Sequence, residues 1–172
     1  ATELLAGRFP LRSSAGLGAI DWPGRWQTVE WAGRRLILDA THNPEGAEAL
    51  TENLRELVAE RGEKPILVAG TLGEERGRSL MQAVAPFASE LYLVKPNQER
   101  AIQPARLGGY LPENLEIPVR HASVEELFSG QSGPGIGRPG EVIVVTGSIY
   151  LIGEVLEQIR GNSGSGSALQ DK

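Results

Sequence analysis

The sequence Leu-Ile-Leu-Asp-Ala-Thr-His-Asn-Pro-Glu-Gly, residues 36–46, predicts a buried strand that runs directly into a helix. Residues 35–38 have the apolar, branched character of a strand covered on both faces, and Asp39 ends it. Asn43 is a favourable N-cap, and Pro44 suits the first helical position because its missing N–H is not needed there. In a parallel sheet this strand-to-helix turn lies at the carboxyl edge, where ligands bind.

The rest of the chain repeats this alternation of strands and helices. A hairpin is expected around Ala32-Gly33, between strands at 27–31 and 34–39. The further expected strands are 65–69, 90–94, 119–121 and 141–146, and the expected helices are 44–61, 78–84, 103–110, 124–128 and 148–160. This order predicts the α/β class: a Rossmann-like, mostly parallel sheet of about six strands with helices on both faces. Only the first strand, tied to the second by the hairpin, is expected to be antiparallel.

Composition divides the chain into three parts. We expect a linker or entry segment over residues 1–21, one domain over 22–160, and a flexible, glycine- and serine-rich tail over 161–172. Within the domain, the stretch 130–140 is rich in glycine and proline and predicts a surface loop. Residues 74–78 predict a solvated loop that leads into the next helix.

The bulk composition is ordinary for a globular domain and excludes several kinds of site. The chain has 172 residues, 40% of them hydrophobic, a net charge of −5 and a pI of about 5.2. This acidity argues against nucleic acid or an anionic membrane as the main partner. Without cysteine, there are no disulfides, thiolate metal sites or cysteine nucleophiles. No apolar run approaches a membrane span and no signal peptide is visible, so we expect a cytoplasmic protein.

Two strand-to-helix turns, 39–44 and 146–148, combine polar side chains with a helix N-terminus, which suits a carboxylate or a phosphate. Ser148 offers a hydroxyl, and His42 can donate, accept or carry charge near neutral pH. Asp39 can hold a ribose hydroxyl, an ammonium group or a magnesium-bound water. Structural roles are equally open: Ser148 as a helix cap, Asp39 as an acceptor of loop N–H groups, and His42 as a surface residue.

Arginines supply the other candidate contacts. Arg25 lies in a turn with two aromatic residues, where it either stacks on Trp22 or Trp26 or contacts a phosphate or an adenine ring. Arg100 is a weaker candidate of the same type. The sequence contains no Gly-x-x-x-x-Gly-Lys-[Ser/Thr] phosphate loop, and no Gly-x-Gly-x-x-Gly follows the first strand. The chain alone therefore has no recognisable means of binding and cleaving ATP or of holding a dinucleotide.

Three segments carry a family resemblance: Pro-Gly-Arg-Trp-Gln at 23–27, Leu-Asp-Ala-Thr-His-Asn-Pro-Glu-Gly at 38–46, and Val-Thr-Gly-Ser-Ile-Tyr-Leu-Ile-Gly-Glu-Val at 145–155. In matching order, from Trp22 to Ile159, they resemble the C-terminal domain of folylpolyglutamate synthase / dihydrofolate synthase, in the Mur ligase superfamily. The pair Arg100-Ala101 is similar to an Arg-Ala pair of that family.

The resemblance implies ATP-dependent amide formation, in which a folate carboxylate becomes an acyl phosphate that the amino group of L-glutamate attacks. It implies that Arg25 and Asp39 reach the ATP, and that His42 and Ser148 help to place the glutamate. ATP and Mg²⁺ would be held mainly by an N-terminal ATPase domain that this sequence lacks. We therefore expect no catalytic residue or metal ligand in this chain, which would act as one domain of a larger, monomeric carboxylate–amine ligase.

The sequence departs from the family pattern at two places. Ala40-Thr41 stands between the Asp and the His where members usually have Gly or Val and then Ala, and Glu74-Glu75-Arg76 replaces a common Asp-Lys-Asp. Two alternatives remain open: a stand-alone α/β module that binds a small anionic ligand or a protein partner, and the C-terminal domain of another Mur-type amide ligase. In the favoured interpretation the isolated chain catalyses nothing.

Overall fold

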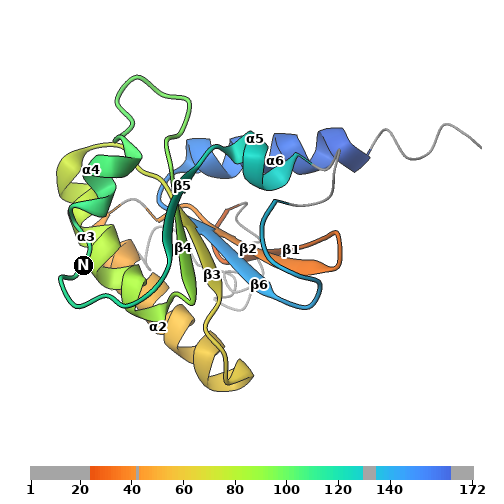
Figure 1. Ribbon diagram of the computed structural model, residues 1–172, viewed down its shortest axis with the longest axis horizontal. Coiled ribbons are helices and arrows are strands. Elements are labelled where there is room, and N and C mark those ends of the chain that lie inside the picture. The colour runs from red at the N-terminus through yellow and green to blue at the C-terminus, as the bar shows by residue number, and fades with distance from the viewer. Residues whose placement is uncertain (1–23, 42, 130–134, 164–172) are drawn as a thin grey trace, which may run out of the picture.

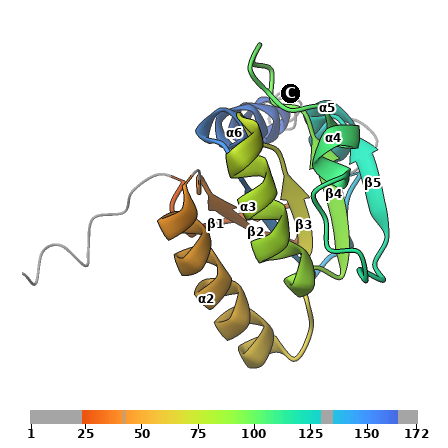
Figure 2. The same ribbon diagram turned by 90° about the vertical axis from the view of Figure 1, so that its left-hand side faces the viewer.

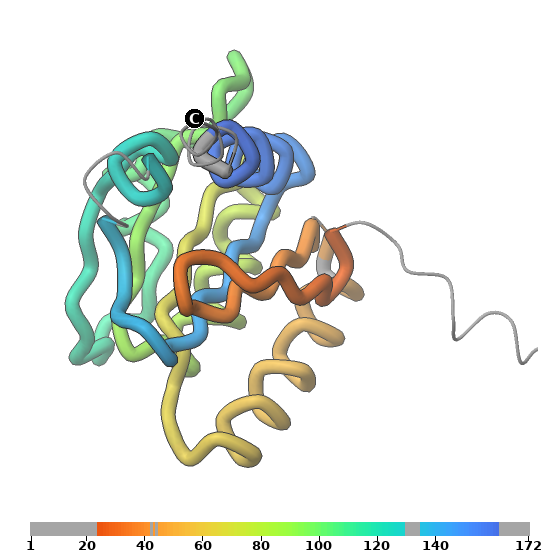
Figure 3. The backbone as a smooth tube through the Cα atoms, turned by 90° about the vertical axis from the view of Figure 1, so that its right-hand side faces the viewer, coloured from red at the N-terminus to blue at the C-terminus, as the bar shows by residue number. Residues whose placement is uncertain are grey.

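The computed structural model describes residues 24–41, 43–129 and 135–163, which form one six-stranded sheet with the strand order β1-β2-β6-β3-β4-β5. The strands are β1 (Gln27–Trp31), β2 (Arg34–Asp39), β3 (Ile66–Ala69), β4 (Glu90–Val94), β5 (Val119–Ala122) and β6 (Val142–Thr146). Strand β1 is antiparallel to β2, and every other neighbouring pair is parallel. The predicted fold class is confirmed. Figure 3 shows the β1–β2 hairpin, in orange, beside the blue strand β6.

Helices cover both faces of this sheet (Figures 1 and 2). They are α2 (Pro44–Arg61), α3 (Glu74–Val84), the short 3₁₀ helix η2 (Ala85–Phe87), α4 (Pro104–Gly108), α5 (Val124–Phe128) and α6 (Ile149–Ser163). Helices α2 and α3 pack side by side on one face, and α5 and α6 pack together on the other. None of the helices among the described residues is long and apolar enough to cross a membrane.

The β1–β2 hairpin and helix α2 have the boundaries that the sequence predicts. Ala32 and Gly33 have φ angles of 48° and 74°, which is the pairing of positive angles that a two-residue hairpin turn requires. The Asn43 side chain caps α2, since its Oδ1 accepts a 2.8 Å hydrogen bond from the Gly46 N–H. Gly62 ends the helix in the left-handed conformation, with φ at 72°. Local sequence therefore defines this hairpin and this helix.

The alternation of side chains along the central strands builds two cores. On one face Ile37, Leu67 and Val144 pack beneath α2 and α3. On the other face Leu38 and Val145 pack beneath α5 and α6. Burial of both faces explains the continuous apolar character of β3, of β6 and of residues 36–38 in β2.

Helix α3 begins at Glu74, four residues before the predicted start at Arg78, so the prediction of a loop over residues 74–76 was wrong, although these residues are exposed to solvent as predicted. Gly73, with φ at 84°, provides the backbone turn into the helix. Glu74 and Glu75 then occupy the first turn, where negative charge complements the helix dipole. The apolar periodicity becomes visible only at Leu80, which is why the sequence places the start too late.

Two other helix ends also differ from the prediction. Helix α6 continues to Ser163, past the expected end at Arg160, because Gly161 does not interrupt it. Helix α4 is shorter than expected and stops at Gly108. Neither difference moves a candidate site residue.

The predicted surface loop at 130–140 is anchored in its described part, so that prediction was wrong for Ile136, which is 2% exposed. The buried guanidinium of Arg34 donates from Nε to the Ile136 carbonyl at 3.0 Å and from Nη2 to the Gly137 carbonyl at 2.7 Å. Its Nη1 donates to the Ala32 carbonyl at 2.7 Å. Arg34 therefore ties the β1–β2 hairpin to the segment that enters β6.

Strand β6 lies between β2 and β3, but the helix that follows it, α6, lies on the opposite face from α2 and α3. In doubly wound sheets such a reversal opens a crevice at the carboxyl ends of the strands. The backbones approach closely here: a Cβ on Gly147 would lie 2.7 Å from the Gly70 carbonyl oxygen, and Gly147 has φ at 109°. A glycine at position 147 is therefore required for the close approach of this turn to Gly70.

We expect Gly147→Ala to lower the free energy of unfolding by about 2–4 kcal/mol, because it combines backbone strain with a clash against Gly70. Gly153→Ala is the matched control in α6, where an added Cβ meets no atom within 4 Å. The control should raise the free energy of unfolding by up to about 1 kcal/mol through helix propensity. Urea unfolding of the 172-residue chain measures both changes, and equal stabilities of the two variants would contradict the close approach.

Candidate functional site

The candidate site is the carboxyl edge of β2, β6 and β3, where the turns 40–43, 70–73 and 147–148 meet. Asp39 and Ala69 are the register partners of Thr146 on either side, so these three residues form a row across the sheet. Both polar members of the row are buried: Asp39 is 7% exposed, and Thr146 is fully buried. No described residue satisfies the Thr146 hydroxyl. The two predicted turns therefore lie next to each other, as the sequence indicated.

The carboxylate of Asp39 is surrounded by donors from its own chain. Its Oδ2 accepts a 3.0 Å hydrogen bond from the Trp26 N–H, and its Oδ1 accepts one of the same length from the Thr41 N–H. The Thr41 hydroxyl also donates to Oδ1. The Ala40 N–H donates to the Gly24 carbonyl at 2.5 Å, which closes the 24–27 turn onto the end of β2. The structural alternative for Asp39, an acceptor of loop N–H groups, is confirmed.

Arg25 lies on this closed turn with an exposed side chain. Its guanidinium has no hydrogen bond, ion pair or ring contact with any described residue, so stacking on Trp26 is not observed, and Trp22 lies outside the described residues. A cavity of about 400 Å³ opens beside it. The lining of this cavity is Arg25, Trp26, Asp39, Ala40, Thr41, Asn43, Glu45, Gly46, Ala49, Leu50 and Asn53. Arg25 therefore presents an uncommitted cation to a cavity large enough for a small molecule.

Ser148 caps helix α6 at the same edge. Its Oγ accepts a 3.2 Å hydrogen bond from the Tyr150 N–H, and its carbonyl accepts the first helical bond from the Ile152 N–H. The residue is 3% exposed, whereas the next two residues, Ile149 and Tyr150, are about half exposed. The capping role of Ser148 is therefore confirmed, and the role in ligand binding stays a prediction.

The remaining predicted residues lie elsewhere or cannot be placed. His42 lies outside the described residues. Arg100 is exposed next to Ala101, which forms an isolated bridge with Leu72. The described residues contain no group of three or more His, Cys, Asp or Glu side chains that could hold a metal ion.

Glu74 makes the main ion pair at this edge. Its carboxylate pairs with the Arg106 guanidinium, with 2.5 Å between Oε1 and Nη2. This hydrogen bond lowers the pKa of Glu74 below its ordinary value. Both side chains are more than half exposed, so the pair fixes α4 against the start of α3 only weakly.

Sequence reasoning missed a second, smaller cavity between the first turns of α2 and α3. It has a volume of about 10 Å³ and is lined by Thr41, Asn43, Ala47, Thr71, Arg76, Ser79 and Leu80. The signal that could have found it is the polar exit turn of β3, residues 70–73, because parallel strands end at the same edge. Thr41 and Asn43 line both this cavity and the larger one.

Comparison with known proteins finds folylpolyglutamate synthases among the relatives of this chain. Folylpolyglutamate synthase from Lacticaseibacillus casei is 29% identical over 154 residues, which are 88% of this chain and 33% of the relative. A bifunctional folylpolyglutamate synthase/dihydrofolate synthase from Yersinia pestis, crystallised with AMPPNP and Mn ion, superposes with a TM-score of 0.70 at 25% identity, over 91% of this chain and 37% of that one. Folylpolyglutamate synthase from Thermotoga maritima gives a TM-score of 0.65 at 25% identity, over 94% and 37% of the two chains.

The chain therefore spans about a third of the length of the curated relative that it matches. Residues 24–149 match the family described as "Mur ligase, glutamate ligase domain". This range runs from the turn that carries Arg25 to the first residue of α6, and so includes both sides of the candidate site. The chain belongs to the Mur ligase glutamate ligase domain family.

Proposed function

We propose that this chain is the glutamate-side, C-terminal domain of an ATP-dependent ligase that adds L-glutamate to folate through an acyl phosphate. The observation that carries the proposal is the carboxyl edge itself, where the uncommitted Arg25 and the capped N-terminus of α6 lie on either side of Asp39. Relatives named folylpolyglutamate synthase support this substrate class. The short length of the match supports a second domain that supplies ATP and Mg²⁺.

In this proposal Arg25 contacts the phosphates of ATP held by the second domain. A planar guanidinium is suited to a phosphate because it donates two parallel hydrogen bonds. Asp39 acts beside it in two ways. Its Oδ2 holds the Arg25 turn in place by accepting a hydrogen bond from the Trp26 N–H, and this oxygen, which has one internal donor, retains an acceptor position for a ribose hydroxyl.

The amino acid would bind on the other side of the same edge. Ser148 and the free N–H groups at the start of α6 suit a carboxylate, and His42, the residue after Thr41 in the sequence, would supply a further hydrogen-bonding side chain. The contribution of these residues is orientation: a glutamate held by its carboxylates presents its amino group to the acyl phosphate. Phosphorylation of the folate would depend on the second domain, because this sequence lacks a phosphate loop.

The first prediction concerns the gene and its product. Sequencing upstream of Ala1 should reveal a Gly-x-x-x-x-Gly-Lys-[Ser/Thr] loop, and the longer product should ligate L-glutamate to a folate in the presence of ATP and Mg²⁺. The 172-residue chain alone should show no ligation, because it contains no phosphate loop. Ligation by the short chain would contradict its dependence on a second domain. A gene that encodes only these residues would favour a stand-alone module that binds a small anionic ligand or a protein partner.

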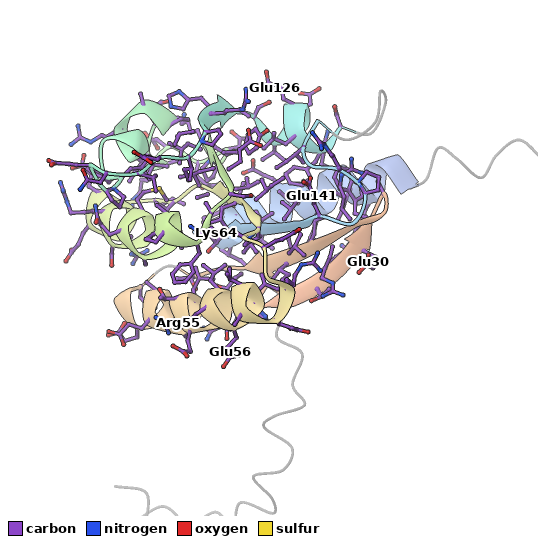
Figure 4. The ribbon with its side chains drawn as sticks, turned by 60° about the horizontal axis from the view of Figure 1, so that its bottom comes forward. Glu30, Arg55, Glu56, Lys64, Glu126 and Glu141 are labelled. Carbon is purple, nitrogen blue, oxygen red and sulfur yellow. The ribbon has the colours of Figure 1, made fainter. Side chains whose placement is uncertain are left out.

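The second prediction tests Arg25 in the longer enzyme. Arg25→Met should raise the KM for ATP roughly 10- to 100-fold, which corresponds to the loss of one charge-assisted hydrogen-bonding group, and should leave the KM for glutamate unchanged. Steady-state kinetics with each substrate varied in turn measures both constants. Arg55→Met is the control: Arg55 lies on the outer side of α2 (Figure 4), where it pairs with Glu52, and its loss should change neither KM. An unchanged KM for ATP in Arg25→Met would remove Arg25 from the nucleotide site.

The third prediction concerns His42. His42→Ala should raise the KM for glutamate by roughly tenfold or more and change the KM for ATP far less, because the imidazole would contact only the amino acid. The same substrate titrations measure both constants. Equal effects on the two substrates would point instead to a general distortion of the turn that carries His42.

A further inference from the structure

Two consecutive large apolar side chains are exposed at the start of α6. Ile149 is 54% exposed and Tyr150 is 49% exposed, and the other large apolar side chain exposed among the described residues is Val119, on the edge strand β5. The Cα–Cβ bonds of a helix tilt toward its N-terminus, so these two first-turn side chains project past the carboxyl edge of the sheet. The contacts proposed above for ATP and glutamate use neither of them.

Ile149 connects this exposed pair to the turn that carries Arg25. A Cβ built on Gly24 would lie 3.5 Å from the Ile149 Cδ1, so the Ile149 side chain lies against the backbone of that turn. The same Cβ position is 3.6 Å from the Cβ of Ala40, at the end of β2. An apolar surface therefore continues from α6 to the residue before Arg25, whose side chain is exposed.

Tyr150 connects the surface to a second loop. Glu154 lies one helical turn after Tyr150 on the same face of α6, and its Oε1 accepts a 2.7 Å hydrogen bond from the Asn97 N–H. Asn97 belongs to the loop that follows β4, so this face of α6 lies beside that loop. The exposed pair thus lies between two polar loops, in the pattern of an apolar interface centre with a polar rim.

The proposed function indicates what covers this surface. Arg25 can contact ATP held by a second domain only if that domain faces the turn 24–26, and Ile149 lies against the same turn. The chain spans 33% of its relative from Lacticaseibacillus casei, so most of such a ligase lies outside it. A contiguous exposed apolar patch marks a contact with a partner, and tyrosine is among the residues that contribute most to such contacts.

We propose that Ile149 and Tyr150 form the apolar centre of the interface between this domain and the ATP-holding second domain, with Arg25 at its rim. The inference rests on the function proposed above and adds to it the surface that joins the two parts of the site. Burial of the two side chains holds the Arg25 turn against the nucleotide. Ser148 immediately precedes Ile149, so the same contact fixes the cap of α6 relative to the nucleotide.

The first test compares the solvent exposure of these side chains in two proteins. Hydroxyl-radical labelling read by mass spectrometry should modify Ile149 and Tyr150 readily in the 172-residue chain. In the longer ligase with AMPPNP and Mg²⁺, the labelling of both should fall about fivefold or more, because interface centres exclude water. Val119 is the internal control, since it is 38% exposed at the amino end of β5 and should be labelled equally in both proteins. Equal labelling of Ile149 and Tyr150 in the two proteins would overturn the interface.

The second test places a charge at the centre of the interface. Tyr150→Asp should lower kcat/KM for ATP in the longer ligase roughly tenfold or more, because it buries a carboxylate among apolar groups. The stability of the 172-residue chain should stay unchanged, because an acidic residue suits the first turn of a helix. Tyr150→Phe keeps the ring and should recover most of the lost activity. Val119→Asp, the matched control, should change kcat/KM less than about twofold. Equal effects of Tyr150→Asp and Val119→Asp would contradict the proposal.

Other occupants of the surface give different labelling results. Protection of Ile149 and Tyr150 in the 172-residue chain that increases with its concentration would assign the surface to a second copy of this chain. Protection in the longer ligase that appears only after a folate is added would assign it to that substrate. Either result would overturn the proposal. Labelling requires no turnover, so a longer chain that protects both residues but ligates no glutamate would reject the proposed function and support the interface.

Discussion

The hydrogen bonds of the Asp39 carboxylate hold the candidate site together. This side chain ends β2, is 7% exposed, and accepts from the backbone on both sides: Trp26 of the preceding turn and Thr41 of the following one. Hydrogen bonds from N–H and O–H groups to a carboxylate are stronger than those to a neutral acceptor, so this side chain can fix the loops around it. Trp26, held with φ at 49°, keeps this rare conformation because the Asp39 contact fixes its N–H. The positions of Arg25 and of the 40–43 turn both depend on this one group.

The order of the strands determines which turns lie beside Asp39 at the carboxyl edge of the sheet. Since β6 is inserted between β2 and β3 while α6 lies on the opposite face, neighbouring strands send the chain toward opposite faces of the sheet, which is the arrangement at which doubly wound sheets bind ligands. The near contact of Gly70 and Gly147 sets the minimum separation of two of those turns. A fold with all its helices on one face would bring the same residues together without a crevice.

Local sequence signals were sufficient where a structure depends on neighbouring residues. The hairpin at Ala32-Gly33, the Asn43 cap and the carboxyl-edge position of Asp39 each follow from a few adjacent side chains. The anchoring of Ile136 by Arg34 could not be predicted, because the two residues are separated by 102 positions and meet only when β6 pairs with β2. The cavity at Arg76 was missed for the same reason, since its lining combines two helices that are adjacent in space and not in sequence.

Two cavities of different size lie at this edge, and an exposed arginine lines each of them. Thr41 and Asn43 line both cavities, with the exposed Arg25 on the larger side and the exposed Arg76 on the smaller. The proposed reaction between a phosphorylated acid and an amino acid needs two anions held close together, and an exposed arginine beside each cavity would reduce their mutual repulsion. Asp39 accepts hydrogen bonds from Trp26, beside Arg25, and from Thr41, which lines both cavities, so a displacement of this carboxylate would disturb both cavities together.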